Sequence, residues 1–352
     1  MLTTKGLFKS LLFSVVSLTL VACSSDKEIE VSKPNDGQTL AQYVASQDFS
    51  GAVLVAKDGE ILLNRGYDYA ERANKVENTS ETIFRIGSIS KQFTTMAVLI
   101  LEERGLLSLD DTLAMYLNDY PNGDKITLKN LLNMTSGIKN YTEMGSFSSY
   151  KNTSLTPLQL IEKFKDAPLE FTPGSKFKYS NSNYVIAGYI IEEVSGKTYA
   201  QFIEQEIFQK LSMTNSSYGK DKIGYDKFAQ GYSNNKPVGD ISMTVPYAAG
   251  ALVSTVEDLY KWHQGVTNRA LISEESTQKM YTVGLNGYAL GWNISTNRHN
   301  EKFYQHGGGI DGFVSYILRS EDSGYFVAVL ANEEEFPSGN LAFNIMSLVD
   351  AD

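Results

Sequence analysis

Two β-hairpin patterns, one near each end of the chain, constrain the fold more than any other feature of the sequence. In each pattern, two apolar runs flank a short turn that contains glycine, Lys57-Asp58-Gly59 in the first and Ser320 to Gly324 in the second. Apolar runs joined by such turns predict antiparallel strand pairs. The paired runs are residues 51–56 with 60–64 and residues 313–319 with 325–331.

The long segment between the hairpins has mostly helical spacing. From Ser88 to Arg104 apolar residues recur every three or four positions, and Gly105 ends the pattern. Strands at both ends with helices between them predict an α+β fold with two lobes. In this prediction the N- and C-terminal segments form one antiparallel sheet, flanked by helices, and an all-helical lobe is inserted. Further helices are predicted at residues 128–134, 181–194, 199–211, 256–266 and 343–348.

The composition excludes several classes of protein. Lys and Arg number 31 against 41 Asp and Glu, a net charge of −10, whereas nucleic acid requires a basic surface. Three His and one Cys are too few for a zinc cluster or a disulfide framework, and no HExxH, Walker A or GxGxxG motif is present. We therefore expect no nucleic-acid partner, no metal and no other cofactor.

The first residues have the pattern of an export signal. Lys5 and Lys9 precede an apolar run from Leu11 to Ala22, shorter than the ~20 residues that span a bilayer. The run ends in Leu20-Val21-Ala22-Cys23, which resembles the bacterial lipobox and contains the only cysteine. The resemblance implies cleavage before Cys23 and a lipid on its sulfur. The alternative is an ordinary secretory peptide with a chance cysteine.

These features divide the chain into three parts. Residues 1–22 are predicted to be a lipoprotein signal peptide, residues 23–38 a lipid-anchored tether, and residues 39–350 the folded domain. The tether is polar and contains Pro34 and Gly37. A lipid anchor makes the membrane a partner and places the protein in the bacterial cell envelope. Ser24, in a position where Asp retains lipoproteins at the inner membrane, favours the periplasmic face of the outer membrane if the bacterium is Gram-negative.

The first candidate catalytic motif is Ser88-Ile89-Ser90-Lys91, at the start of a predicted helix. Residues i and i+3 share a helix face, so Ser88 Oγ and Lys91 Nζ can meet. A serine becomes a nucleophile when a base takes its proton, and a lysine is that base only if its pKa falls from ~10.4 toward 7–8. The helix N-terminus also offers N–H groups to an oxyanion. The alternative is a capping serine beside a solvated lysine.

Two later segments supply groups of matching chemistry. The hydroxyl of Tyr179, in Tyr179-Ser180-Asn181, can relay a proton if a nearby cation lowers its pKa from ~10, and the Asn181 amide can orient a carbonyl and a lysine. In His306-Gly307-Gly308-Gly309 the glycines let a substrate pair with the backbone. The alternatives are a core tyrosine beside a helix cap and a glycine-rich turn with a bystander histidine.

Together these segments resemble the superfamily of serine β-lactamases and penicillin-binding proteins, and most of all its class C branch with the related esterases and D-amino-acid peptidases. Five segments occur in the family's order, within roughly residues 49–332. They are Phe84 to Thr94 around the serine, Leu131 to Gly137 with Met134 where the family has His, Tyr179-Ser180-Asn181, Gly250 to Leu259, and His306-Gly307-Gly308, which stands where true β-lactamases carry Lys-Thr-Gly.

The resemblance implies a β-lactamase/transpeptidase-like fold and a serine hydrolase that needs no metal or cofactor. Ser88 would form an acyl-enzyme, Lys91 and Tyr179 would share the general-base work, and Asn181 would orient the acyl side. Which of Lys91 and Tyr179 takes the proton is left open. The oxyanion hole would be the backbone N–H groups of Ser88 and Gly309.

His306 is the departure that bears on the substrate. The family's lysine at this position helps bind a substrate carboxylate, and a neutral imidazole attracts a carboxylate less than an ammonium does. This favours an esterase, a D-aminopeptidase or a weak D-alanyl-D-alanine carboxypeptidase. A weak class C-type β-lactamase and a catalytically inactive penicillin- or peptide-binding lipoprotein are the alternatives. Residues 141–152, polar and aromatic, are predicted to form a loop over the pocket.

Overall fold

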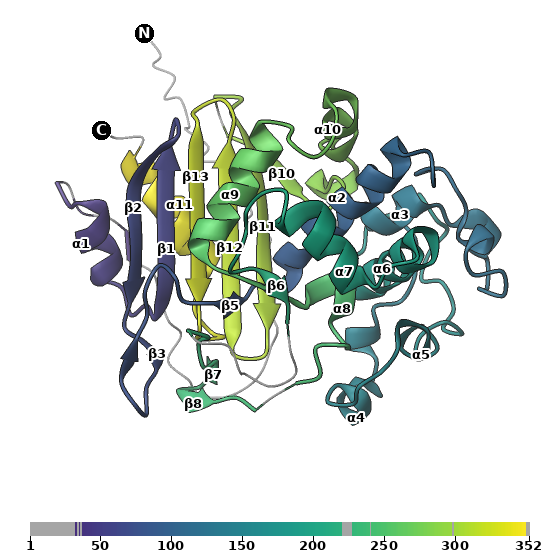
Figure 1. Cartoon of the computed structure of the whole chain (residues 1–352), viewed down its shortest axis with the longest axis horizontal. Helices are drawn as coiled ribbons and strands as arrows, with labels where there is room; N and C mark the ends of the chain where they lie inside the picture. Colours follow the sequence, from purple (N-terminus) through teal and green to yellow (C-terminus); the bar gives the residue numbers. More distant parts are fainter. Residues whose placement is uncertain are drawn as a thin grey trace, which may run out of the picture.

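The computed structural model describes residues 32–349 except 34, 36, 220–226, 240 and 298. The predicted signal peptide and Cys23 lie outside these residues. A six-stranded antiparallel sheet, formed by the two ends of the described chain, stands beside a mainly helical lobe (Figure 1). The strand order is β10 (Asn293–Thr296), β11 (Lys302–Ile310), β12 (Phe313–Ser320), β13 (Tyr325–Ala331), β1 (Gly51–Lys57) and β2 (Glu60–Tyr67).

Both predicted hairpins form. Asp58 and Gly59, in the β1–β2 turn, have φ of +50° and +88°, the left-handed values that a tight hairpin turn requires. The two hairpins meet where β1 pairs with β13, with Val53 opposite Val329. This pairing joins segments from opposite ends of the chain into one continuous sheet.

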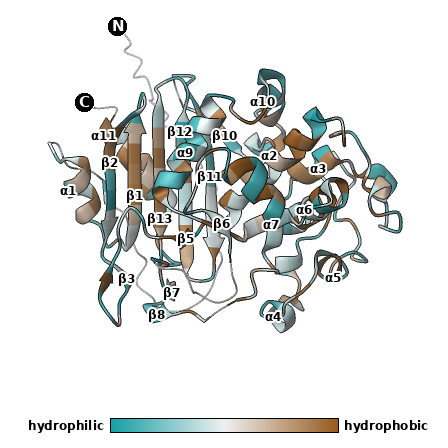
Figure 2. Ribbon diagram, in the orientation of Figure 1, coloured by the Kyte–Doolittle hydropathy of each residue, from teal (hydrophilic) through white to brown (hydrophobic). Residues whose placement is uncertain are grey.

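Both faces of the central strands are covered, which explains why β1 reads as an unbroken apolar run. Val53 and Val55 face the cluster around α11 (Ser338–Val349), whereas Ala52 and Leu54 face the cluster that continues into the helical lobe. Figure 2 shows the hydrophobic colouring along β1 and in the lobe. α1 (Leu40–Ala45) packs on the α11 side, and α9 (Val256–Thr267) packs on β13 and β1.

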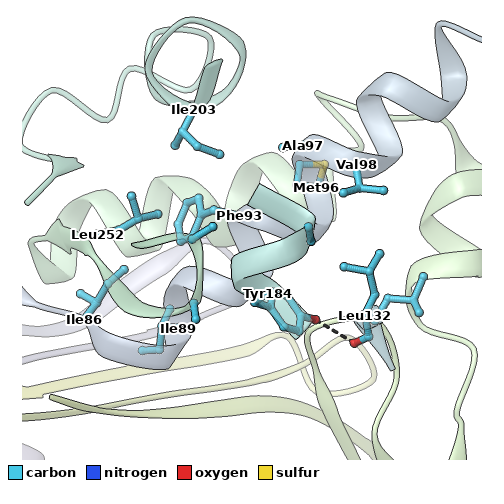
Figure 3. Packing of buried hydrophobic residues seen from close by; sticks show 14 of the residues in the cluster. Ile86, Ile89, Phe93, Met96, Ala97, Val98, Leu132, Tyr184, Ile203 and Leu252 are labelled. Atoms are coloured by element: carbon cyan, nitrogen blue, oxygen red, sulfur yellow. Dashed lines mark hydrogen bonds between the residues drawn. The ribbon is translucent and has the colours of Figure 1, made fainter. Parts of the chain in front are cut away.

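The helical lobe is built around α2 (Ser90–Glu103), which is buried along most of its length. Phe93 and Met96 of α2 lie among side chains such as Ile203 and Leu252, and the Tyr184 hydroxyl donates to the Leu132 carbonyl over 2.8 Å (Figure 3). The other helices are α3 (Leu128–Leu132), α4 (Phe147–Tyr150), α5 (Pro157–Ile161), α6 (Asn181–Ser195), α7 (Tyr199–Ile203), α8 (Tyr247–Gly250) and α10 (Glu274–Met280).

Several elements differ from the sequence prediction. The inserted segment is not all helical, because β5 (Phe84–Arg85), β9 (Leu252–Ser254) and β6 (Ser217–Tyr218) form a small sheet next to Ser88. A 3₁₀ turn, Gly87–Ile89, precedes α2, and α7 continues as a π-helical turn, Glu204–Phe208. Two further strand pairs are β3 (Tyr69–Glu71) with β4 (Val76–Glu77) and β7 (Tyr232–Ser233) with β8 (Lys236–Pro237).

The first described residues are held against the domain. The Tyr43 hydroxyl donates to the Ser32 carbonyl over 2.8 Å, and Asn344 Nδ2 donates to the same oxygen over 3.2 Å. The end of the predicted tether therefore lies on α1 and α11. In the part of the chain that the structure describes, no helix is both long enough and apolar enough to cross a membrane.

Candidate active site

Ser88 lies at the junction of the helical lobe and the sheet, in the 3₁₀ turn that leads into α2. Gly87 before it has a φ of +50°, and a Cβ built there would lie 2.8 Å from the backbone nitrogen of Gly309 on β11. A glycine is required on both counts, by conformation and by the close approach of the strand. The turn thus presents a half-buried Ser88 directly beside the end of β11.

The two other serines that could have been mistaken for the nucleophile have structural roles. Ser90 is fully buried, and its Oγ accepts the backbone N–H of Leu252 over 3.1 Å. Ser136, also buried, donates from its Oγ to Asn183 Oδ1 over 2.6 Å.

Lys91 is fully buried on α2 and is directed at Ser88. Its Nζ lies 3.0 Å from Ser88 Oγ, 2.8 Å from Asn181 Oδ1 and 2.7 Å from the Ala249 carbonyl oxygen. Burial lowers the pKa of Lys91 well below its ordinary value. A neutral amine matches this geometry, because its two hydrogens satisfy Asn181 and Ala249 and its lone pair faces the Ser88 hydroxyl.

Tyr179 borders the same site, but its ionisation differs from the sequence prediction. The Lys91 nitrogen lies 4.9 Å from the centre of the Tyr179 ring. We expected a cation of this kind to lower the tyrosine pKa. Instead, burial raises the pKa of Tyr179 well above its ordinary value, and a hydrogen bond with Ser88 opposes the rise only in part. Tyr179 therefore holds its proton at neutral pH.

Asn181, the first residue of α6, is fixed by two side chains from the segment after Gly137. Its backbone N–H donates to Asn140 Oδ1 over 3.1 Å, and its Nδ2 donates to Thr142 Oγ1 over 3.3 Å. These bonds aim Oδ1 at Lys91. Thr142 lies in the segment predicted to border the pocket, whereas Asn140 was not singled out, although the family-like segment ending at Gly137 was an available signal for it. Met134, which replaces the family's His, receives the Ser180 N–H at its sulfur over 3.4 Å.

The predicted loop over the pocket is instead two short helical turns, Tyr141–Glu143 and α4. The Tyr141 side chain is buried, and its hydroxyl donates to the Val245 carbonyl over 2.6 Å. Lys151, just after α4, forms an ion pair of 3.0 Å with Asp311 in the β11–β12 turn. The segment therefore contacts Asn181 through Thr142 and the β11–β12 turn through Lys151.

The glycines of His306-Gly307-Gly308-Gly309 let β11 approach the serine turn. A Cβ at Gly308 would lie 2.1 Å from the Ile86 carbonyl oxygen, whereas a Cβ at Gly309 would meet nothing within 4 Å. Gly309 is exposed, and it lies beside Gly87. The backbone N–H groups of Ser88 and Gly309, assigned to the oxyanion hole by the resemblance, therefore belong to segments in contact.

His306 is buried at the edge of the site, with both ring nitrogens engaged. It is 3% exposed, its Nδ1 lies 2.6 Å from the Gly307 carbonyl oxygen, and its Nε2 lies 3.1 Å from the Tyr288 hydroxyl. A carbonyl only accepts, so Nδ1 carries the hydrogen and Nε2 accepts from Tyr288. Burial is the main cause that lowers the pKa of His306 to about 4. The ring is therefore neutral at pH 7, and both of its nitrogens are already engaged.

The described residues bring together Ser88, Lys91, Tyr179, Asn181 and the His306–Gly309 strand in one place. Within the described ranges, no group of three or more His, Cys, Asp or Glu side chains is arranged to hold a metal ion. A serine beside a buried lysine, next to a glycine strand end, defines the class of protein as a serine hydrolase with a Ser-x-x-Lys site.

Comparison with known proteins gives the family. Residues 37–349 match the Beta-lactamase family, and the chain belongs to it. The PbpX protein of Bacillus subtilis (strain 168), named as a penicillin-binding protein, is 34% identical over 286 residues, 79% of this chain and 70% of its own length. The chain is therefore a serine hydrolase of the penicillin-binding-protein type.

Two solved structures are similar over most of the chain. The octameric penicillin-binding protein homologue from Pyrococcus abyssi has a TM-score of 0.76 and 30% identity, covering 86% of this chain and 74% of its own. The D-stereospecific amidohydrolase from a Streptomyces species has a TM-score of 0.74 and 25% identity, covering 88% and 98%.

Proposed function

We propose that this protein hydrolyses esters or amides of D-amino acids through an acyl-Ser88 intermediate, with neutral Lys91 as the base. The arrangement around Lys91 Nζ is the observation that carries the proposal. Two carbonyl oxygens, of Asn181 and Ala249, accept its hydrogens at 2.8 Å and 2.7 Å, and Ser88 Oγ lies at the remaining position at 3.0 Å. The side chain of Lys91 forms no ion pair among the described residues, so its buried surroundings favour the uncharged amine.

The steps follow from these positions. Ser88 Oγ attacks the carbonyl carbon while its proton passes to Lys91 Nζ, and the oxyanion is held by the N–H groups of Ser88 and Gly309. Tyr179 is protonated in the resting enzyme. It donates this proton to the departing alcohol or amine and is then reprotonated by Lys91. A water molecule then attacks the carbonyl carbon of the acyl-serine. Its proton passes through Tyr179 and Lys91 to Ser88 Oγ as the acyl–oxygen bond breaks, which releases the acid and regenerates Ser88.

The state of His306 supports the choice of substrate. A terminal carboxylate would find at this position a neutral ring whose two nitrogens are already bonded to Gly307 and Tyr288. Amides and esters that lack a terminal carboxylate are therefore favoured over D-alanyl-D-alanine ends and over β-lactams. The name of the Streptomyces relative, a D-stereospecific amidohydrolase, supports the same class.

Trapping the intermediate tests the proposal. A fluorophosphonate probe should label the wild type and Ser90→Ala but not Ser88→Ala, and mass spectrometry should find the adduct on Ser88. D-alanine p-nitroanilide should be cleaved at least ~10-fold faster than its L-enantiomer and faster than a D-alanyl-D-alanine peptide. A folded wild type that takes no label would mean a binding protein without catalysis. An adduct elsewhere would mean that the nucleophile is misassigned.

We further propose that the enzyme acts at the cell envelope, anchored by a lipid on Cys23. Leu20-Val21-Ala22-Cys23 and the absence of any other cysteine support this location. Cys23→Ser should release the protein from the membrane fraction or leave its signal peptide uncleaved. Normal processing with unchanged membrane fractionation would contradict the anchor and leave the hydrolase proposal untouched.

A further inference from the structure

The substrates proposed above carry a positive charge, and the side chains around Ser88 offer it no counter-charge. An ester or amide of an amino acid keeps its α-amino group, whose ordinary pKa is ~7.7–8.0, so most of it is protonated at neutral pH. Burial leaves Lys91, Tyr179 and His306 uncharged, and Asn181 is an amide. A carboxylate within reach of the acyl group would therefore favour these substrates.

Asp311 supplies a carboxylate just beyond the end of β11. It is the first residue of the two-residue turn between β11 and β12, in which Ile310 pairs with Phe313. Because it follows Gly309 by two positions, the Cα atoms of the two residues are at most about 7 Å apart. A substrate carbonyl oxygen that accepts the Gly309 N–H is only three covalent bonds from the α-amino nitrogen of the same acyl group. The Asp311 carboxylate and that ammonium can therefore meet.

The turn that carries Asp311 is fixed by contacts other than its ion pair. The backbone N–H of Gly312 donates to Glu334 Oε2 over 3.2 Å, and the Gly312 carbonyl accepts the Tyr232 N–H over 3.2 Å. Gly312 has a φ of +81°, and a Cβ built there would lie 2.8 Å from the backbone of Gly231, so only a glycine fits. The backbone of Asp311 is therefore held in place even when its side chain changes partner.

The partner of Asp311 in the structure is a lysine from the other side of the site. Lys151 follows α4 of the helical lobe, whereas the β11–β12 turn ends two strands of the sheet (Figure 1). The Lys151 nitrogen lies 3.0 Å from Asp311 Oδ2, and both side chains are 37% exposed. An ion pair that is this exposed contributes little to stability. A substrate ammonium can therefore take the place of the lysine ammonium at little cost.

A second carboxylate beside the site, that of Glu143, is already engaged. It accepts from Asn140 Nδ2 over 3.0 Å and pairs with Lys178 at 3.3 Å. Asn140 also receives the backbone N–H of Asn181, so turning Glu143 toward a ligand would disturb the support of Asn181. Asp311, by contrast, has Lys151 as its one ion-pair partner within the described chain.

We propose that Asp311 is a specificity-determining residue, which binds the α-ammonium of the substrate's acyl group and releases Lys151 when it does so. This inference rests on the hydrolase proposed above. It narrows the substrates to D-amino-acid esters and amides with a free amino group and disfavours N-acylated ones. The ammonium would contact Asp311 both before and during attack by Ser88, so the preference should appear mainly in KM.

Two matched substrates test the proposal, D-alanine p-nitroanilide and its N-acetyl derivative, compared by the ratio of their kcat/KM values. In the wild type the ratio should favour the free amine at least ~10-fold. Asp311→Asn should lower the ratio about 5- to 20-fold, chiefly through KM, and Asp311→Glu should keep part of it. Lys151→Gln frees the carboxylate and should leave the ratio unchanged or raise it. Glu274→Gln, which breaks an exposed ion pair of 3.2 Å with Arg269, is the matched control and should keep the ratio.

Three results would overturn the proposal and leave the hydrolase standing. An unchanged ratio in Asp311→Asn, with an unchanged melting temperature, would mean that Asp311 does not recognise the ammonium. Equal losses in Asp311→Asn and Lys151→Gln would make the ion pair a structural link between sheet and lobe. A wild type that cleaves the N-acetyl substrate as fast as the free amine would have no such preference. A wild type that forms no acyl-Ser88 adduct would instead remove the hydrolase proposal, and this inference with it.

Discussion

Lys91 and Arg319 are both almost completely buried basic side chains, yet the protein places them in opposite surroundings. Lys91 has only neutral acceptors, the oxygens of Ser88, Asn181 and Ala249. Arg319 has the carboxylate of Glu321 and two hydroxyls. A lysine deprived of a counter-charge loses its proton and becomes a base, whereas a guanidinium does not deprotonate in proteins. The comparison shows how similar burial produces a catalytic base at one place and a structural role at the other.

Replacing each of these two basic residues by the other type gives the largest expected change in kcat. Lys91→Arg should lower kcat for a p-nitrophenyl ester by about 10²- to 10⁴-fold, because a guanidinium cannot take the Ser88 proton. Arg319→Lys should leave kcat within about threefold of the wild type, since no atom of Arg319 lies in the Ser88 site. Steady-state kinetics on both variants, with melting temperatures to confirm folding, make the comparison. Comparable losses of kcat in Lys91→Arg and Arg319→Lys would mean that Arg319 also affects catalysis at Ser88.

Removing the buried guanidinium should cost stability rather than activity. Arg319→Leu loses the hydrogen bonds to Tyr281 and Thr267 and leaves the half-buried Tyr281 hydroxyl without this donor, at a cost of about 1–3 kcal/mol in the free energy of unfolding. The half-exposed Glu321 returns to water, so the ion pair itself adds little. Urea unfolding measures the change. A variant as stable as the wild type would show that the Arg319 contacts contribute nothing net.

The pH dependence of catalysis tests whether Lys91 is neutral. The active form is the free amine, so kcat/KM for a neutral ester should be constant above the Lys91 pKa and fall about tenfold per pH unit below it. Because burial places that pKa well below the usual ~10.4, the plateau should be reached before pH 9. Arg319→Leu should give the same profile. A rate that still rises from pH 9 to pH 10.5 would show that Lys91 is charged at neutral pH.

His306 should produce the smallest effect. With a pKa of about 4, it stays neutral from pH 5.5 to 8, so nothing in the site gains or loses charge there through this ring. The kcat/KM ratio of p-nitrophenyl hemisuccinate, which carries a carboxylate, to p-nitrophenyl butyrate should therefore be constant over this range. His306→Gln should leave it equally constant. If the ratio declines through pH 6.5 in the wild type but not in His306→Gln, then a protonated His306 binds the substrate carboxylate.

Much of the fold and the core of the site could be predicted from the sequence because the signals are local. The i, i+3 spacing of Ser88 and Lys91 places the two on one helix face, and the glycine turns at Asp58-Gly59 and Gly324 produce the hairpins. The small sheet β5–β9–β6 was not predicted. Its strands have two or three residues each, too few to show a period.

The parts of the site that were missed depend on contacts between distant segments. The Ala249 carbonyl that binds Lys91 is 158 positions along the chain, and backbone oxygens carry no sequence signature. Tyr288, which occupies one nitrogen of His306, is one of 21 tyrosines, and nothing in its neighbourhood marks it.

By itself, the sequence determined which groups the protein could use: a serine and a lysine one helical turn apart, a tyrosine and an asparagine before a second helix, and a glycine strand near the C-terminus. Only the tertiary structure decided their states. Burial among neutral acceptors lowers the pKa of Lys91, burial raises that of Tyr179, and burial lowers that of His306 and keeps its ring neutral. The physical reason is that a protonation state depends on the solvent and charges within a few ångströms, and folding alone brings those neighbours together.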